Sequence, residues 1–277
     1  MKTFTVMMDL LREARNRKWF LALGIGITLL HVLLFTSLKL DVVDGALAAT
    51  RLFGNWATED IQPVDVALRP VFAFASQAIF YGGMLFGILA CADFGPSLLS
   101  PGRIEHLLAL PVRRWELLLG TFLGVLVLAM MASLYGAGGL TVVLGIKGGF
   151  WTWRPLVSAL LAGLGFSTVY AGMLVTALYV RSASLSAFVG IFLFLSGLLA
   201  SYRDAILPVF SRGVGRSLFA AYTSVMPRVG GLAQLSAEIA GSGRIDVGRA
   251  AQLLAGFVVF TLAALALGVW RFEQRDF

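Results

Sequence analysis

The chain has 277 residues, of which 58% are hydrophobic and only 13% are charged. Soluble domains are roughly 45–50% apolar and about 25% charged, so this composition excludes an ordinary soluble protein. The net charge of +7 fits anionic lipid headgroups better than nucleic acid, because there is no basic soluble domain to bind nucleic acid.

The first segment, residues 1–18, is basic and amphipathic. Phe4, Met7, Met8 and Leu11 form an apolar stripe at helical spacing beside several basic residues. This pattern predicts a helix that lies along the inner leaflet. The basic cluster also places the N-terminus in the cytoplasm under the positive-inside rule.

Six runs free of Asp, Glu, Lys and Arg are long enough to cross a bilayer, which takes about 20 apolar residues. Such unbroken apolar runs satisfy their backbone groups as helices, whereas spanning barrels show short alternating segments. We therefore predict an all-α polytopic membrane protein, a single domain over residues 1–277 with both termini cytoplasmic. The spans are expected at about 19–38, 70–92, 117–146, 155–180, 182–202 and 250–270.

The first run also invites comparison with a secretory signal peptide, since Ala46-Leu47-Ala48 offers a small-residue cleavage pattern. The apolar part of a signal peptide is about 7–15 residues long, which is shorter than this run. We expect a retained span.

The long segment 203–249 follows the fifth span. Pro208, Pro227 and several glycines interrupt it, so none of it forms a full span. We expect short helices that dip into the outer leaflet, with a plain external surface loop as the alternative. Apolar patches in this segment include Val209, Phe210, Leu218, Phe219, Leu232 and Leu235.

The sequence lacks the residues that several kinds of chemistry require. No phosphate-binding loop occurs, and the single cysteine, Cys91, allows no disulfide within the chain. His31 is the only histidine in a span, and a hydrogen bond to a neighbouring helix is favoured over catalysis. The six runs contain no carboxylate to carry a coupling ion. We expect no catalytic residue, no metal site and no cofactor site in this chain.

Two glycine pairs, Gly83/Gly87 and Gly120/Gly124, have the spacing that lets helices approach closely. Because the chain contains 31 glycines, such pairs arise readily by chance. Packing within the subunit is therefore favoured over a dimer contact.

The loop 93–116 is expected to contain a short amphipathic helix. Ile104, Leu107, Leu108 and Trp115 share one helical face, and Pro101-Gly102 and Pro111 isolate the helix on both sides. Periodicity alone supports a helix resting on the membrane as well as one docked to a partner protein.

The run from Gly102 to Gly124 resembles the signature of a known protein family. It includes Glu105-His106-Leu107-Leu108 and Pro111-Val112-Arg113-Arg114-Trp115-Glu116, and it resembles the signature of the type-2 permease family of ATP-binding-cassette exporters. Arg103, Arg113 and Thr121 depart from the family's usual Thr, Ser and Lys. The basic N-terminal helix, the six runs and the long segment before the last run extend the resemblance over the whole chain.

The resemblance implies a permease subunit with no nucleotide site of its own. Its 93–116 loop would be a cytoplasmic coupling helix seated in a cleft of a separate ATPase subunit, which would hold ATP and Mg. A second permease copy or a paralogue would complete a homodimer or heterodimer in a bacterial-type inner membrane, in contact with membrane lipid. The residues implied in ATPase coupling are Gly102, Ile104, Glu105, Leu107, Leu108, Pro111 and Trp115.

The sequence indicates only the general class of the substrate, and it does not identify the residues of a translocation path. Spans without charge suit a hydrophobic or amphipathic passenger. The alternative function is a membrane-embedded enzyme or scaffold that acts on lipid.

Overall fold

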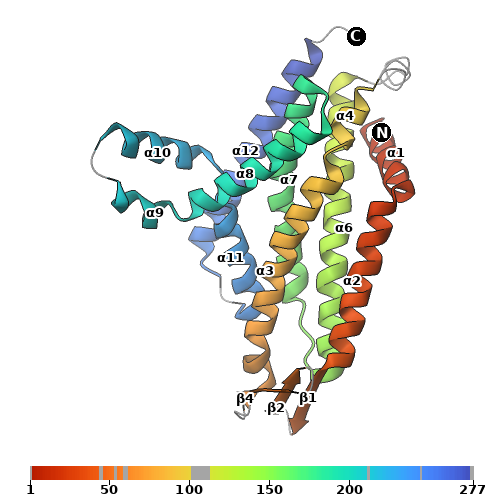
Figure 1. The fold of residues 1–277 in the computed structure, drawn as a ribbon, viewed down its shortest axis with the longest axis vertical. Coiled ribbons are helices and arrows are strands. Elements are labelled where there is room, and N and C mark those ends of the chain that lie inside the picture. The colour runs from red at the N-terminus through yellow and green to blue at the C-terminus, as the bar shows by residue number, and fades with distance from the viewer. Residues whose placement is uncertain are drawn as a thin grey trace.

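The computed structural model describes residues 2–43, 46–52, 55–58, 62–100, 113–210, 213–243 and 245–274. Within them, six helices are long and apolar enough to cross a membrane, and they are grouped about the long axis of the molecule (Figure 1). The predicted all-α membrane fold with six spans is confirmed. These helices are α2 (Lys18–Ser37), α3 (Val64–Cys91), α6 (Arg114–Gly148), α7 (Arg154–Val180), α8 (Ala183–Ser201) and α12 (Val247–Glu273).

The two ends of the bundle differ. Figure 1 shows α1 (Lys2–Asn16), the start of α6 and the last turns of α12 at one end, and four short strands at the other. The end that carries α1 is the one that the basic N-terminal cluster assigns to the cytoplasm, and this orientation stays a prediction.

A small antiparallel sheet connects α2 to α3, which the sequence analysis did not predict. β2 pairs with β1 on one side and with β3 and β4 on the other. The alternation of apolar and polar residues after residue 38 was the available signal, since it has the period of a strand. The strands are β1 (Leu38–Val43), β2 (Ala46–Leu52), β3 (Asn55–Thr58) and β4 (Gln62–Pro63).

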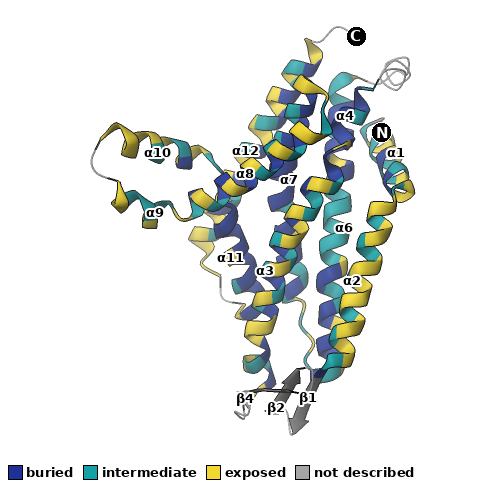
Figure 2. Ribbon diagram, viewed as in Figure 1, coloured by how far each residue is buried: buried dark blue, intermediate teal, exposed yellow. Residues whose placement is uncertain are grey.

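The core is built around α7, the most deeply buried of the six long helices. It packs against α3, α6, α8 and α12, and Figure 2 shows its residues largely in the buried class. Gly165 of α7 permits a close approach, because an added Cβ would lie 2.9 Å from the ring of Phe80 in α3. At the other extreme, α2 contains no buried residue over its whole described length.

Hydroxyl groups tie helices together inside the apolar core. Ser76 of α3 and Ser158 of α7 each hydrogen-bond Ser236, at 2.9 and 2.7 Å, and also each other. Thr168 of α7 pairs with Thr261 of α12 at 2.8 Å. Because a buried hydroxyl without a partner is costly in a membrane, these pairs favour one arrangement of the helices.

The described residues between α8 and α12 form four short helices, and the two halves of this segment are placed differently. Figure 1 shows α9, η1 and α10 projecting sideways from the bundle, whereas α11 packs against α3 and α7. Consequently Val209 and Leu218 are exposed, whereas Leu232 and Leu235 are buried in the core. The depth of these helices in the membrane stays a prediction. They are α9 (Arg203–Ile206), η1 (Leu207–Val209), α10 (Val214–Val225) and α11 (Val229–Gly241).

Candidate functional site

Half of the 93–116 loop, which is predicted to couple to an ATPase, lies outside the described residues. Its central positions 101–112 include Gly102, Ile104, Glu105, Leu107, Leu108 and Pro111, and these residues stay predictions. Trp115 is described, in the first turn of α6, where it is half-buried. What the structure describes are the two flanks of the loop and the elements that hold them.

The entry flank is the short helix α4 (Phe94–Leu98), which follows the end of α3. Phe94, Leu98 and Leu99 are all buried. An added Cβ at Gly95 would lie 2.6 Å from the Cβ of Ala177 in α7. Since only a glycine allows this approach, the sequence sets α4 directly against the central helix of the bundle.

The exit flank is the start of α6. The backbone N–H of Arg113 donates to Glu116 at 2.8 Å, which satisfies a donor left free at the helix N-terminus. The guanidinium of Arg114 donates to the carbonyl oxygens of Phe272 and Glu273, each at 3.3 Å. A cation is favourable at the C-terminal end of a helix, so this contact ties the exit of the loop to the end of α12.

Arg17 ties the junction of α1 and α2 to the entry flank. Its guanidinium donates to Glu13 at 2.6 Å and to Asp93 at 3.0 Å, and it lies 4.3 Å above the ring centre of Phe94. Partial burial opposes the charged form, but hydrogen bonds and charge from Glu13 and Asp93 outweigh it, so the pKa of Arg17 is raised. Arg17 therefore stays a cation between two carboxylates.

The N-terminal helix α1 packs against α6 at a pair of glycines. An added Cβ at Gly120 would lie 2.6 Å from the Cβ of Val6, and one at Gly124 would lie 2.9 Å from the side chain of Leu10. This confirms for Gly120/Gly124 that the spacing serves packing within the subunit. Gly87 likewise lies against Phe166 within the chain, whereas Gly83 faces open space.

The face of α1 that packs on the bundle differs from the predicted stripe. Leu10 and Ala14 are buried, whereas Phe4 of the predicted stripe is 61% exposed. The predicted stripe was assigned to the inner leaflet and not to the bundle, so an exposed Phe4 is compatible with it, and the contact of α1 with the membrane stays a prediction. The Phe4 face is left for the membrane interface or a partner.

His31 and Cys91 both lie in the long helices. His31 of α2 hydrogen-bonds the carbonyl oxygen of Gly136 in α6 at 3.0 Å, which confirms the predicted contact with a neighbouring helix. Cys91 is a buried free thiol. Among the described residues, no group of three or more His, Cys, Asp or Glu side chains could hold a metal ion.

The hydrogen bonds of Arg17 and Arg114, which hold the two flanks of the loop, were not predicted from the sequence. Arg17 belongs to the N-terminal basic cluster and Arg114 to the run that resembles the permease signature, and their partners lie 76 and more than 150 residues away. A single sequence carries no signal for such pairs, apart from the presence of an acid at the start of the loop.

A family model described as an ABC-2 family transporter protein matches residues 10–277. None of the curated proteins matches the chain.

Proposed function

Because the chain belongs to the ABC-2 transporter family, a family of membrane subunits of ABC transporters, we propose that it is the permease of an ATP-driven exporter. Its passenger would be hydrophobic or amphipathic, and ATP would be hydrolysed by a separate ATPase subunit. The observation that carries this proposal is the family match over residues 10–277. The anchored flanks of the 93–116 loop add a physical reason for coupling at that loop.

The flanks provide a rigid connection between the loop and the spans. α4 lies directly on α7, Arg114 holds the end of α12, and Arg17 joins the α1–α2 junction to Asp93. A displacement of the loop would thus reach four helices through packed contacts rather than through a flexible linker. Such a connection suits a transporter that changes between two conformations biased by nucleotide.

The ATPase would bind at the loop itself. Ile104, Leu107 and Leu108 provide an apolar face with charged neighbours, which suits a hydrophobic groove rimmed by polar groups. ATP and Mg would belong to that partner, since the sequence lacks a phosphate-binding loop. A second permease, either a copy or a paralogue, would complete the exporter in a bacterial-type inner membrane.

The nature of the passenger is inferred from the spans. The runs that form the six long helices contain no Asp, Glu, Lys or Arg, and burying a charged passenger among such helices would be costly. Side-chain hydroxyls such as those of Thr168 and Ser158 are engaged in contacts between helices. A hydrophobic or amphipathic molecule fits this environment best.

The proposal is tested in vesicles that contain the permease with its ATPase. A fluorescent short-chain phospholipid and an amphipathic dye serve as probes, with ionophores present to collapse proton and sodium gradients. ATP-dependent outward movement that needs both subunits is the expected result. Movement without ATP, or a chemical change of the phospholipid by the permease alone, would favour the lipid-acting alternative.

A further inference from the structure

One side of the short helix α11 is polar and partly exposed. Gln234 is exposed there, and Glu238 lies one turn further on. The guanidinium of Arg249, in the first turn of α12, donates to Gln234 at 2.8 Å and to Glu238 at 3.3 Å. The other sides of α11 are buried against α3, α7 and α8. We call Gln234, Glu238 and Arg249 the polar face of α11.

Contacts with α3 fix the position of α11 along the bundle. In the middle of α11, the hydroxyl of Ser236 hydrogen-bonds Ser76 of α3 at 2.9 Å. At its end, an added Cβ at Gly241 would lie 3.0 Å from the carbonyl oxygen of Arg69. The helix α11 therefore runs beside the first half of α3 and ends near the last charged residue before the charge-free run 70–92.

This position places the polar face at the depth of the hydrocarbon. Ser76 lies six residues inside the run 70–92, which is about 9 Å along a helix, and the hydrocarbon of a bilayer is roughly 30 Å thick. Gln234 comes two residues before Ser236 and so lies about 3 Å nearer the middle of the bilayer. Glu238 comes two residues after Ser236 and lies about 3 Å nearer the surface, still inside the hydrocarbon.

The direction of Arg249 is the second observation. Arg249 directly precedes the charge-free run 250–270. A long basic side chain at such a place normally extends outward to the headgroups. Arg249 instead bonds Gln234, fifteen residues earlier in the chain and at hydrocarbon depth. Its charge is therefore turned into the membrane.

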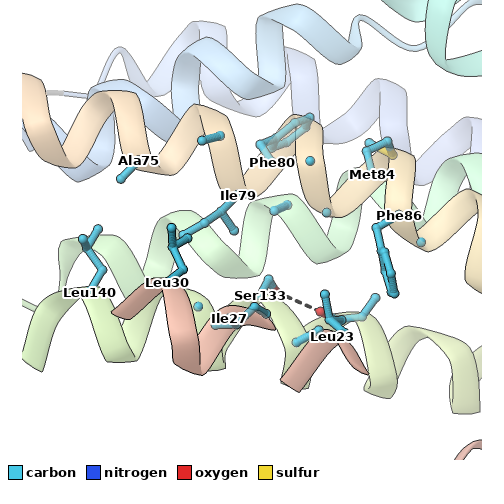
Figure 3. A pocket seen from close by; sticks show the side chains of 18 of the residues that line it. Leu23, Ile27, Leu30, Ala75, Ile79, Phe80, Met84, Phe86, Ser133 and Leu140 are labelled. Atoms are coloured by element: carbon cyan, nitrogen blue, oxygen red, sulfur yellow. Dashed lines mark hydrogen bonds between the residues drawn. The ribbon is translucent and has the colours of Figure 1, made fainter. Parts of the chain in front are cut away.

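Lipid suits other parts of the bundle surface but not this one. Figure 3 shows Leu30 of α2 and Ile79 of α3 in the lining of an apolar cleft. By contrast, the side chains of Arg249 and Glu238 are 42% and 43% exposed. Charged groups at this depth face either the interior of a bundle or a water-filled cavity, because hydrocarbon cannot solvate them. Since the polar face lies on the outside of this bundle, a water-filled cavity is the remaining surrounding.

We propose that the polar face of α11 forms one wall of a water-filled part of the translocation path, through which the polar headgroup of an amphipathic passenger crosses. Water would satisfy the donors and acceptors that Gln234, Glu238 and Arg249 do not use among themselves. A second permease would bound the passage on its other side, so this inference rests on the proposed function. It also narrows the passenger to an amphipathic molecule, because a purely apolar one gains nothing from a water-filled path.

The first measurement is water access in the full-length permease, in cell membranes opened so that both faces are reached. In a Cys91→Ser background, Gln234→Cys and Glu238→Cys are treated separately with a charged methanethiosulfonate. Because the reactive thiolate forms in water and not in hydrocarbon, both should react rapidly. Phe74→Cys is the matched control, since Phe74 is 75% exposed and lies two residues from Ser76. It should stay unreactive.

The second measurement connects the polar face to transport. ATP-driven outward movement of an amphipathic dye is followed in vesicles that contain the permease and its ATPase, before and after the reagent reacts with Gln234→Cys. We expect the charged adduct to remove most of the dye movement while ATP hydrolysis continues. The Cys91→Ser permease without the new cysteine should be unaffected by the reagent.

Two results would overturn the proposal. One is a Gln234→Cys and a Glu238→Cys permease that both react as slowly as Phe74→Cys, which would show that lipid or packed protein covers the polar face. The other is dye movement that the adduct leaves unchanged. An unmodified permease that moves no dye with ATP would instead contradict the proposed function, and the thiol reactivities would still test the polar face by themselves.

Discussion

The guanidinium of Arg17 donates a hydrogen bond to the carboxylate of Asp93 at 3.0 Å, and so joins the α1–α2 junction to the entry of the 93–116 loop. The ring of Phe94 lies beneath the same guanidinium at 4.3 Å. Two segments that lie 76 residues apart in the sequence are therefore held in contact at this end of the bundle.

Replacing Arg17 should impair coupling more than stability. The pair is partly exposed, so Arg17→Gln should cost less than about 1 kcal/mol of unfolding free energy. The permease should stimulate its ATPase less, by a roughly two- to thirtyfold factor if the contact contributes about 0.5–2 kcal/mol of coupling. Thermal unfolding and ATP hydrolysis by the complex measure the two effects. Arg15→Gln, at an exposed position of α1, is the control, and equal behaviour of the two variants would contradict the role of Arg17.

A methyl group at Gly120 should loosen α1 from the bundle. The added Cβ would lie 2.6 Å from Val6 and 2.9 Å from the carbonyl oxygen of Thr3. We expect Gly120→Ala to destabilise the protein by about 1–3 kcal/mol, as overpacking does, and to expose α1 to protease. Thermal unfolding in one detergent and limited proteolysis measure this.

The control for Gly120 is another glycine of the same helix. An added Cβ at Gly138 would lie 3.7 Å from Leu156, an ordinary contact. Because alanine is the better helix former, Gly138→Ala should be neutral or stabilising. The account of α1 fails if Gly120→Ala is as stable and as protease-resistant as Gly138→Ala.

The buried serine cluster should act as one unit. Ser158→Ala removes two hydroxyl contacts between helices and should cost about 0.5–1.5 kcal/mol. Ser236→Ala should cost a similar amount, and the double variant should cost less than the sum, because both serines share the same contacts. Unfolding in detergent gives the three values, with the exposed Ser224→Ala as control. Strict additivity would show that the hydroxyls do not form a network.

The six long helices could be predicted because a bilayer imposes a simple rule on sequence: long runs without charge. It is harder to predict which face of a helix packs on the bundle and which helices pack against each other. The sequence predicted an interfacial stripe on α1 but not the face that packs on the bundle, where Leu10 lies against Gly124 of α6, more than a hundred residues further along, and Ala14 is buried.

Burial in the 203–249 segment could not be predicted from the local sequence either. Leu218 and Leu232 are both apolar and both lie between interrupting prolines and glycines, yet one is exposed and the other is buried. The difference arises because α11 packs against α3 and α7, and local composition does not encode that contact.

Topology can be tested with two engineered cysteines in a Cys91→Ser background. Ser97 lies in α4, and Ser242 follows α11, whose last residue, Gly241, contacts Arg69 near the start of α3. We expect a membrane-impermeant maleimide to label a cysteine at Ser242 from outside intact cells, and one at Ser97 only after the inner face is opened. Labelling of both positions from outside would rule out the six-span orientation.

We propose that the 93–116 loop couples this permease to an ATPase, and the rate of ATP hydrolysis by the reconstituted complex measures this coupling. Leu108→Asp would bury an unpaired carboxylate in the groove of the ATPase, which costs several kcal/mol. His106→Gln leaves the apolar face intact and is the control. The account predicts that wild type and His106→Gln change the ATPase rate and co-purify with the ATPase, whereas Leu108→Asp does neither. A Leu108→Asp permease that inserts, binds the ATPase and changes its rate as wild type does would contradict the claim.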